Sequence, residues 1–191
     1  MKKIRIFLAS SRELQPEREH FEREVYRKCK AWFERGIFLH LDIWEDLSAR
    51  MSATGSQSEY NRLVEAADLF VLLAYTKVGM YTGEEFDRAF GQFAATRKPF
   101  IFTYFKTPDG VITDPSLAAF HQKLRALKHY YSPFRDENDL WNQFNKELER
   151  LEAAAFAENR WTESGAGLRS ITQGDKSVYI ERSDHLTINI Q

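Results

Sequence analysis

The sequence contains a single cysteine and no marked excess of either charge. Cys29 alone, in a chain of 191 residues, excludes a disulfide framework and a cysteine-rich metal site. The 27 Lys and Arg residues nearly balance the 28 Asp and Glu residues, so the net charge of -1 favours neither a nucleic acid nor a membrane surface as partner. No apolar run reaches the ~20 residues of a membrane span, and the apolar stretch near the start is too short for a signal peptide. These absences predict a cytoplasmic protein that binds neither nucleic acid nor membrane.

Two common kinds of site are also missing from the sequence. The five histidines are scattered without the spacing of metal ligands, so we expect no bound metal. There is no phosphate-binding P-loop and no complete dinucleotide fingerprint, which excludes ATPases and ordinary dehydrogenases. Apolar residues, in contrast, are plentiful: a content of 43% hydrophobic and 14% aromatic residues is enough to bury one sizeable core.

Apolar runs alternate with helical patterns over most of the chain. Runs bounded by polar residues predict strands, and apolar residues at helical spacing predict helices. Because the two alternate, we expect an α/β fold of three layers, in which helices cover both faces of a mainly parallel sheet. The strands are expected at residues 3–9, 37–44, 69–75, 99–105 and, at one edge, 130–134, and the helices at 15–35, 57–67, 84–97, 116–129 and 137–157.

The C-terminal part departs from this alternation. Residues 158–172 are poor in large apolar side chains and include Gly165 and Gly167, so they are predicted to form a flexible linker. Residues 173–191 hold two alternating apolar runs separated by a short polar segment, a pattern typical of a β-hairpin. The predicted organisation is a domain at 1–157, a linker and a hairpin. Since an isolated hairpin is marginally stable in water, we expect it to dock on the domain, on a second copy or on a partner protein.

The strongest sign of a ligand site is the strand at 69–75 and the segment that follows it. This strand is apolar throughout, as a strand buried on both faces is, and a glycine-containing turn leads from it into a helix that carries Glu84 and Glu85. In open α/β sheets, ligands bind beyond the carboxyl ends of the strands, where these two acids are expected to lie. The alternative is that both are simply residues of the first helical turn, where the helix dipole favours acids.

Two other strand ends carry candidate binding residues. Ser10, Ser11 and Arg12 follow the first strand, where backbone N–H groups and a guanidinium could hold a pyrophosphate or a ribose. A serine at this place could instead cap a helix. Trp44, at the end of the second strand, could stack on an adenine or nicotinamide ring or pack inside the core.

Several segments together resemble a bacterial Toll/interleukin-1 receptor (TIR) type domain. They are residues 4–11, the long polar loop after the second strand, residues 65–73 and residues 81–86. The resemblance implies a flavodoxin-like fold and often the cleavage of NAD+ at its nicotinamide glycosidic bond, as in the TIR domains of anti-phage defence. In the enzymatic members a glutamate lies four residues after an aromatic residue. Tyr81 and Glu85 share this spacing, although the usual aromatic residue is tryptophan.

The resemblance makes Glu85 the candidate catalytic residue and NAD+ a substrate rather than a cofactor. When nicotinamide leaves, the ribose becomes cationic, and an ionised carboxylate beside it stabilises the developing charge. The residues expected to bind the substrate are Ser10, Ser11, Arg12, Trp44, Tyr81 and Glu84. TIR-type domains commonly act when packed side by side, so the resemblance also implies self-association through the loop at 45–58.

Two other functions are compatible with the same sequence. A nucleoside deoxyribosyltransferase-like enzyme also combines a doubly wound sheet with a glutamate at an N-glycosidic bond, but it would act on nucleosides and ignore NAD+. A non-enzymatic TIR-type adaptor would use the 45–58 loop for association, and it would keep its partners when Glu85 is replaced.

Overall fold

The computed structural model describes residues 1–43 and 56–153, without the side chains of residues 56–60. Trp44, the linker at 158–172 and the hairpin at 173–191 therefore lie outside the described residues, as does the predicted loop at 45–58 except for its last three residues, which begin a helix. Residues Met1–Leu148 form one compact unit, to which the following description applies.

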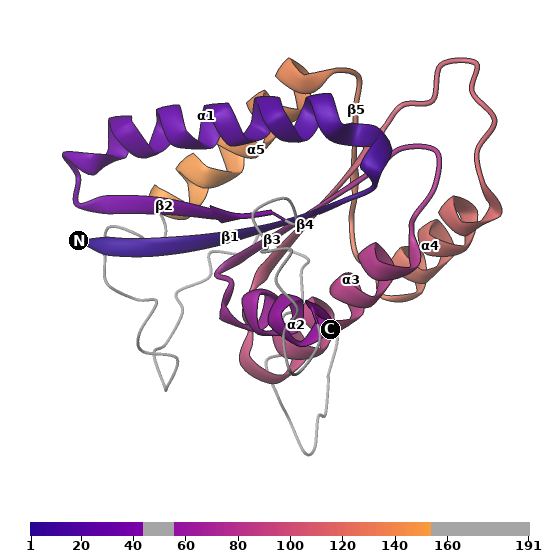
Figure 1. The fold of residues 1–191 in the computed structure, drawn as a ribbon, viewed down its shortest axis with the longest axis horizontal. Coiled ribbons are helices and arrows are strands. Elements are labelled where there is room, and N and C mark those ends of the chain that lie inside the picture. Colours follow the sequence, from indigo (N-terminus) through magenta and orange to yellow (C-terminus); the bar gives the residue numbers. More distant parts are fainter. Residues whose placement is uncertain (44–55, 154–191) are drawn as a thin grey trace, which may run out of the picture. The chain divides into compact units, whose positions relative to one another are not determined.

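The unit is built on a five-stranded sheet in which all neighbouring strands are parallel (Figure 1). The strand order β2-β1-β3-β4-β5 is that of flavodoxin-like folds and confirms the predicted fold class. Because β1 and β3 are neighbours, Ser10 at the end of β1 pairs with Leu73 near the end of β3. Strands β2 and β5 form the two edges. The strands are β1 (Lys2–Ser10), β2 (Ile37–Asp42), β3 (Leu69–Ala74), β4 (Phe100–Lys106) and β5 (Ser132–Phe134).

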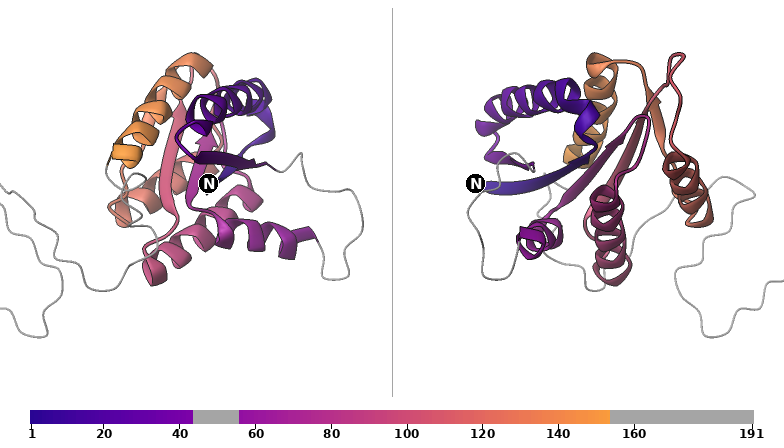
Figure 2. Two further views of the ribbon diagram at one scale, coloured as in Figure 1. Left: turned by 90° about the vertical axis from the view of Figure 1, so that its left-hand side faces the viewer. Right: turned by 45° about the vertical axis from the view of Figure 1, so that its right-hand side comes forward.

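Helices cover both faces of this sheet. In Figure 1, α1 and α5 lie on one side of the strands and α2, α3 and α4 on the other, and Figure 2 shows this arrangement from two further directions. A short 3-10 helix, η1, connects β1 to α1. The helices are η1 (Arg12–Leu14), α1 (Gln15–Phe33), α2 (Ser56–Ala66), α3 (Met80–Thr96), α4 (Pro115–Ala126) and α5 (Glu137–Leu151). In the described part of the chain, no helix is both long and apolar enough to cross a membrane.

Aromatic side chains fill the space between the sheet and each helical layer. On the side of α3 and α4, the rings of Phe86 and Phe120 meet edge to face with centroids 5.0 Å apart. On the side of α1 and α5, the rings of Phe21 and Phe144 are 4.8 Å apart. All six residues of β3 are buried, as its unbroken apolar sequence predicts for a central parallel strand. Cys29 is buried too, and its sulfur accepts a hydrogen bond from the backbone N–H of Leu39 at 3.3 Å.

The main correction to the predicted elements concerns the start of α3. The sequence predicts a turn up to Gly83 and a helix from Glu84, whereas the helix already begins at Met80. Gly79 takes the N-cap position with an extended backbone, and Gly83 lies inside the helix, where its N–H bonds to the carbonyl of Gly79 at 3.0 Å. The other ends differ by a few residues, and residues 154–157 of the helix predicted at 137–157 lie outside the described residues.

Candidate active site

Glu85 lies on the buried face of α3, the helix that follows β3. The buried residues of this helix are Thr82, Glu85, Phe86 and Ala89, which recur at the spacing of a single helical face. The buried residues that follow Glu85 on this face of α3 are apolar, because Phe86 and Ala89 belong to the hydrophobic core. Only 8% of the surface of Glu85 is exposed, an unusual position for a carboxyl group.

The surroundings of Glu85 favour its neutral form. Burial raises the pKa of its carboxyl group from 4.5 to about 7, and the negative charge of the neighbouring Glu84 adds to the rise. Within the described residues, no side chain donates a hydrogen bond to it or forms an ion pair with it. Burying a carboxyl group without a partner is costly, so structure alone gives no reason to keep an acid here.

The helix-dipole interpretation of the two acids is wrong. Because α3 begins at Met80, Glu84 and Glu85 fall in its second turn, and the first turn contains no acidic residue. The dipole acts on charges within the first turn, so it does not account for them.

The two acids face different surfaces, although they are adjacent in sequence. Glu84 is exposed and lines a hollow between α2 and α3, which Glu85 does not line. An ion pair of 2.8 Å between Arg88 and Glu65 joins the two helices in this hollow. Tyr81, which is 63% exposed, projects from the first turn of α3. The structure therefore separates Glu84 from Glu85 and leaves Tyr81 open to solvent.

The serines after β1 are engaged by charged side chains. Arg18, which is 2% exposed, donates hydrogen bonds to the side chain of Ser10 at 2.9 Å and to the carbonyl of Ser11 at 2.8 Å. Ser11 occupies the N-cap position of η1, but its hydroxyl donates to Glu13 at 3.0 Å and makes no capping hydrogen bond. Arg12 is exposed on η1. The side-chain capping interpretation is therefore wrong for Ser11.

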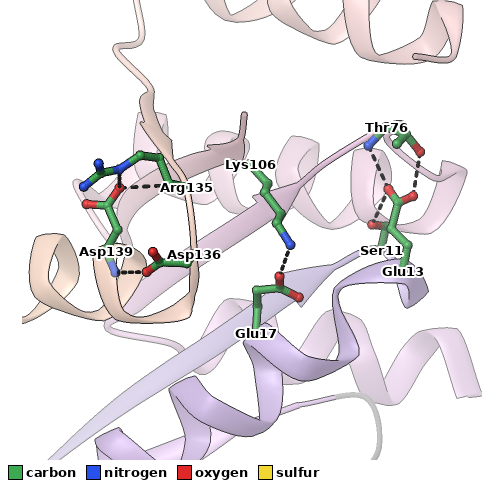
Figure 3. Close-up of polar contacts among 8 residues, drawn as sticks. All are labelled: Ser11, Glu13, Glu17, Thr76, Lys106, Arg135, Asp136 and Asp139. Atoms are coloured by element: carbon green, nitrogen blue, oxygen red, sulfur yellow. Dashed lines mark hydrogen bonds and ion pairs between the residues drawn. The ribbon is translucent and has the colours of Figure 1, made fainter. Parts of the chain in front are cut away.

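Glu13 ties the loop after β1 to the connection between β3 and α3. Its carboxylate accepts hydrogen bonds from the backbone N–H of Thr76, at 2.9 Å, and from the hydroxyl group of Thr76 (Figure 3). Burial works to raise the pKa of Glu13, but hydrogen bonds from Thr76, Ser11 and the backbone of Lys77 outweigh it and lower the pKa. Glu13 is thus held as a carboxylate, in contrast to Glu85.

The same connection is joined to the loop before α4. The backbone N–H of Asp114 donates to the carbonyl of Thr76 at 2.8 Å, and the N–H of Val78 donates to the hydroxyl of Ser116 at 3.2 Å. Residues 75–79, which form the loop after β3, are therefore hydrogen-bonded to the loop after β1 and to the loop after β4. Because the sheet is parallel, all three loops lie at the edge where the strands end, which we call the carboxyl edge.

A partly buried ion pair completes the carboxyl edge. Glu17, which is 3% exposed, accepts a hydrogen bond from Lys106 at the end of β4 (Figure 3). This bond is the main cause that raises the pKa of Lys106, whose ammonium group also lies 5.2 Å from the ring of Tyr75. Sequence analysis missed Glu13, Glu17 and Lys106. In the sequence, Glu17 resembles any acidic residue in the first turn of a helix. The signal that could have identified it is its position next to Arg18 on the face of α1 whose other buried residues are apolar.

Comparison with known proteins finds a likeness in structure but not in sequence. No protein family model and no curated protein matches the chain. Among solved structures, the chain is similar to one described as "Crystal structure of the RPS4 and RRS1 TIR domain heterodimer", with a TM-score of 0.51 and 9% identity. The likeness covers 78% of this chain and 97% of that one. The chain has a TIR-like fold. At this level of identity, the likeness concerns the fold alone.

Within the TIR-like fold, most predicted site residues come to the carboxyl edge. Ser10, Ser11 and Arg12 lie there next to the β3–α3 connection, from which Tyr81 and Glu85 follow on α3. Glu84 points to the hollow between α2 and α3 instead. The arrangement offers one buried acid of raised pKa, with an aromatic ring one turn before it on the same helix and exposed cationic side chains on the adjoining loops.

Proposed function

We propose that this protein is an NAD+ glycohydrolase that cleaves the bond between nicotinamide and ribose, with Glu85 as its catalytic residue. The observation that carries the proposal is the buried carboxyl group of Glu85, which has no described partner and lies at the carboxyl edge of a TIR-like fold. A protein that keeps an unpaired acid in a costly place commonly uses it for chemistry.

Glu85 would act on the charge that the reaction creates. As the glycosidic C–N bond breaks, its electron pair stays on nicotinamide, which leaves as a neutral ring, and the positive charge moves to the ribose. A carboxylate beside the sugar stabilises this cation until water adds to the anomeric carbon and gives up a proton. Bound NAD+ brings a positively charged ring near Glu85, and this charge favours the ionised form of an acid whose pKa is about 7.

Replacement of each acid in turn tests this assignment. Glu85→Gln keeps the shape of the side chain and removes its charge, so we expect NAD+ cleavage to fall by roughly 100-fold or more. Glu84→Gln is the matched control, because it makes the same change on an exposed neighbour. Nicotinamide release is measured by chromatography, and circular dichroism checks that both variants fold. Loss of activity in the Glu84 variant, with activity kept in the Glu85 variant, would overturn the assignment.

Incubation with a mixture of nucleosides separates this proposal from the deoxyribosyltransferase alternative. That enzyme would exchange bases between nucleosides and leave NAD+ intact, whereas the proposed glycohydrolase would release nicotinamide and leave the nucleosides intact. The same assay covers the adaptor alternative, which predicts that neither substrate changes.

Assembly is the second part of the proposal. The structure to which this chain is similar is described as a heterodimer of TIR domains, which supports association as a property to test here. We propose that self-association through the 45–58 loop activates the enzyme in bacterial defence signalling, and that the 173–191 hairpin docks a partner protein. The product, linear or cyclic ADP-ribose, depends on which nucleophile reaches the ribose after the same bond breaks.

A further inference from the structure

Two histidines connect α4 to the elements beside it. His121 lies within the helix, and His129 lies in the turn that follows its last residue, Ala126. Both side chains are partly buried, and the Nε2 atom of each is shut off from solvent without a hydrogen-bond partner in the described part of the chain. Polar atoms inside a protein are nearly always hydrogen-bonded, so these two nitrogens are exceptions that call for a physical reason.

The ring of His121 is enclosed by aromatic rings from two other segments. It stacks on Tyr131, just before β5, with the centroids 4.7 Å apart and the planes inclined by 3°. It also meets Phe105 of β4 edge to face at 4.3 Å. Burial is the main cause that lowers the pKa of His121, and the positive charge of Arg125, one turn later on α4, adds to it. The surroundings therefore favour the neutral ring.

His129 is fixed by the turn that ends α4. Its backbone N–H donates to the carbonyl of Leu124 at 2.9 Å, and Lys128 before it adopts a left-handed conformation with a φ of 53°. The ring of His129 lies 6.2 Å from that of Phe86 on α3. Burial lowers the pKa of His129 as well, and among the described residues no charged side chain adds to this effect.

The charged residues near these rings are engaged elsewhere. Lys123 of α4 forms an ion pair with Asp87 of α3, and its ammonium group lies 5.8 Å from the ring of Phe86. Asp114, at the start of α4, accepts a hydrogen bond from the N–H of Ser116 at 2.8 Å. Within the described ranges, no carboxylate pairs with either histidine, so nothing compensates the charge that they gain on protonation.

Protonation works against the contacts of both histidines. A neutral imidazole can leave one nitrogen without a proton, whereas the protonated ring carries an N–H at each nitrogen. Each buried Nε2 then becomes a donor without an acceptor, on a ring that is positively charged. The face of Tyr131 attracts a cation, but at His121 the charge of Arg125 opposes this attraction.

We propose that His121 and His129 form a pH-sensitive switch, which holds α4 in place while both rings are neutral and releases this helix locally when they take up protons. Release removes the buried side chains of Leu117, Phe120 and Leu124 from the core. It also uncovers Phe86, whose ring meets that of Phe120 edge to face. The switch is independent of the proposed enzymatic activity.

The direction of the pH effect follows from the two states of α4. The pKa of each histidine is below 6.5 while α4 is packed, and it returns to 6.5 when the ring is exposed. The released state therefore binds more protons, so the stability that the neutral histidines contribute is complete above pH 6.5 and is lost as pH falls below it. Glu85 acts in the opposite direction when the whole unit unfolds, because its pKa is raised in the folded state.

Hydrogen exchange of the full chain, measured by mass spectrometry, tests the switch. After correction for the direct effect of pH on exchange, we expect the protection of the α4 amides to fall about tenfold or more between pH 7.5 and pH 5. Amides of α1, on the other face of the sheet (Figure 1), should lose less, because protonated Glu85 stabilises the unit as a whole. Equal losses in α1 and α4, or none in α4, would overturn the proposal.

Replacement of the two histidines assigns the effect. The double variant His121→Phe, His129→Phe keeps two aromatic rings and removes both titrations, so α4 should keep its protection at pH 5. The matched control is His20→Phe on α1, which should behave like the wild-type protein. A loss of protection that persists in the double variant would assign it to other groups, such as Asp87 or Asp114, and refute the switch.

A measurement on the wild-type protein decides the matter if the double variant does not fold. NMR follows the imidazole C–H signals of His121 and His129 together with the amide signals of α4 as the pH is lowered. We expect both rings to take up protons over the same pH range in which the α4 signals of the packed state disappear. Protonation of either ring while α4 stays packed, or release of α4 while both rings remain neutral, would contradict the proposal.

Discussion

At the scale of single residues, two acids of the carboxyl edge are kept in opposite states. Glu13 receives several hydrogen bonds, which lower its pKa, whereas Glu85 receives none in the described structure, and its pKa is raised to about 7. Burial acts in the same direction on both acids, but Glu85 is more deeply buried and also feels the negative charge of Glu84, whereas hydrogen bonds outweigh burial at Glu13. One acid therefore stabilises the fold as an anion, while the other costs stability when it ionises.

This cost predicts how stability depends on pH. Between pH 4.5 and about 7, Glu85 is ionised in the unfolded chain but still protonated in the folded one, so the free energy of unfolding falls as pH rises through this range. Glu85→Gln removes this dependence and should make the protein more stable than wild type at pH 8, by about 3 kcal/mol, and equally stable near pH 4. Urea unfolding at several pH values measures the difference. Parallel curves for the two proteins would contradict the prediction.

At the scale of elements, the connection between β3 and α3 is the part on which the site depends. It donates hydrogen bonds to Glu13 in the loop after β1 and accepts one from Asp114 in the loop before α4, and it leads directly into the helix that carries Glu85. Residues 75–79 therefore set the position of the start of α3 and, with it, of Glu85.

Thr76→Val tests the tie to Glu13. The change removes the hydroxyl donor and keeps the shape of the side chain, so we expect a loss of about 1 kcal/mol in the free energy of unfolding at pH 7. Because hydrogen bonds lower the pKa of Glu13 in the folded state, this stabilisation is present above its unfolded pKa of 4.5 and fades as pH falls below it. The loss should therefore be smaller at pH 3.5. Thr107→Val, on an exposed threonine at the end of β4, serves as the control, and an equal loss in both variants at both pH values would exclude a specific tie.

Local sequence patterns predicted the sheet and its helices but not the contacts between distant loops. The apolar run of β3 could be recognised because a strand buried on both faces is apolar at every position. The start of α3 was misplaced because Gly79 and Gly83 both favour a turn, and only the structure shows that one caps the helix and the other lies inside it. Glu13 bonds to a residue 63 positions away and Glu17 to one 89 positions away. No local pattern reveals such pairs.

At the scale of the whole molecule, the proposed self-association predicts how activity depends on concentration. If the loop at 45–58 of one copy completes the site of the next, specific activity should rise with protein concentration, because the assembled fraction rises. Nicotinamide release and light scattering are measured over the same range of concentrations. Constant specific activity of a protein that stays monomeric throughout would exclude activation by assembly.

Truncation tests the role of the C-terminal hairpin. Residues Met1–Leu148 form a compact unit with their own buried core, so a chain that ends at Ala157 should fold and keep its basal NAD+ cleavage. We expect it to lose partner binding, since Val178, Ile180 and the apolar residues that follow would be missing. Thermal unfolding of the full and shortened chains decides the matter. A much lower melting temperature for the shortened chain would show that the hairpin belongs to the core of the domain.

The short edge strand β5 limits how these molecules can join. The carbonyl of Phe134 accepts a hydrogen bond from the N–H of Thr107, at 2.8 Å, so it faces β4. Because backbone groups of successive residues point to opposite sides of a strand, the backbone of Pro133 faces the open edge of the sheet. Proline has no N–H to offer, and its carbonyl already accepts a hydrogen bond from Gln143 of α5 at 2.9 Å. Another strand thus finds no donor at Pro133 and an acceptor that is already engaged, so in the described sheet β2 is the edge better suited to extension. If β2 of one molecule pairs with β2 of a second, no β2 edge remains free, so strand pairing of this kind ends at two molecules. A longer filament would then need contacts between helices and loops.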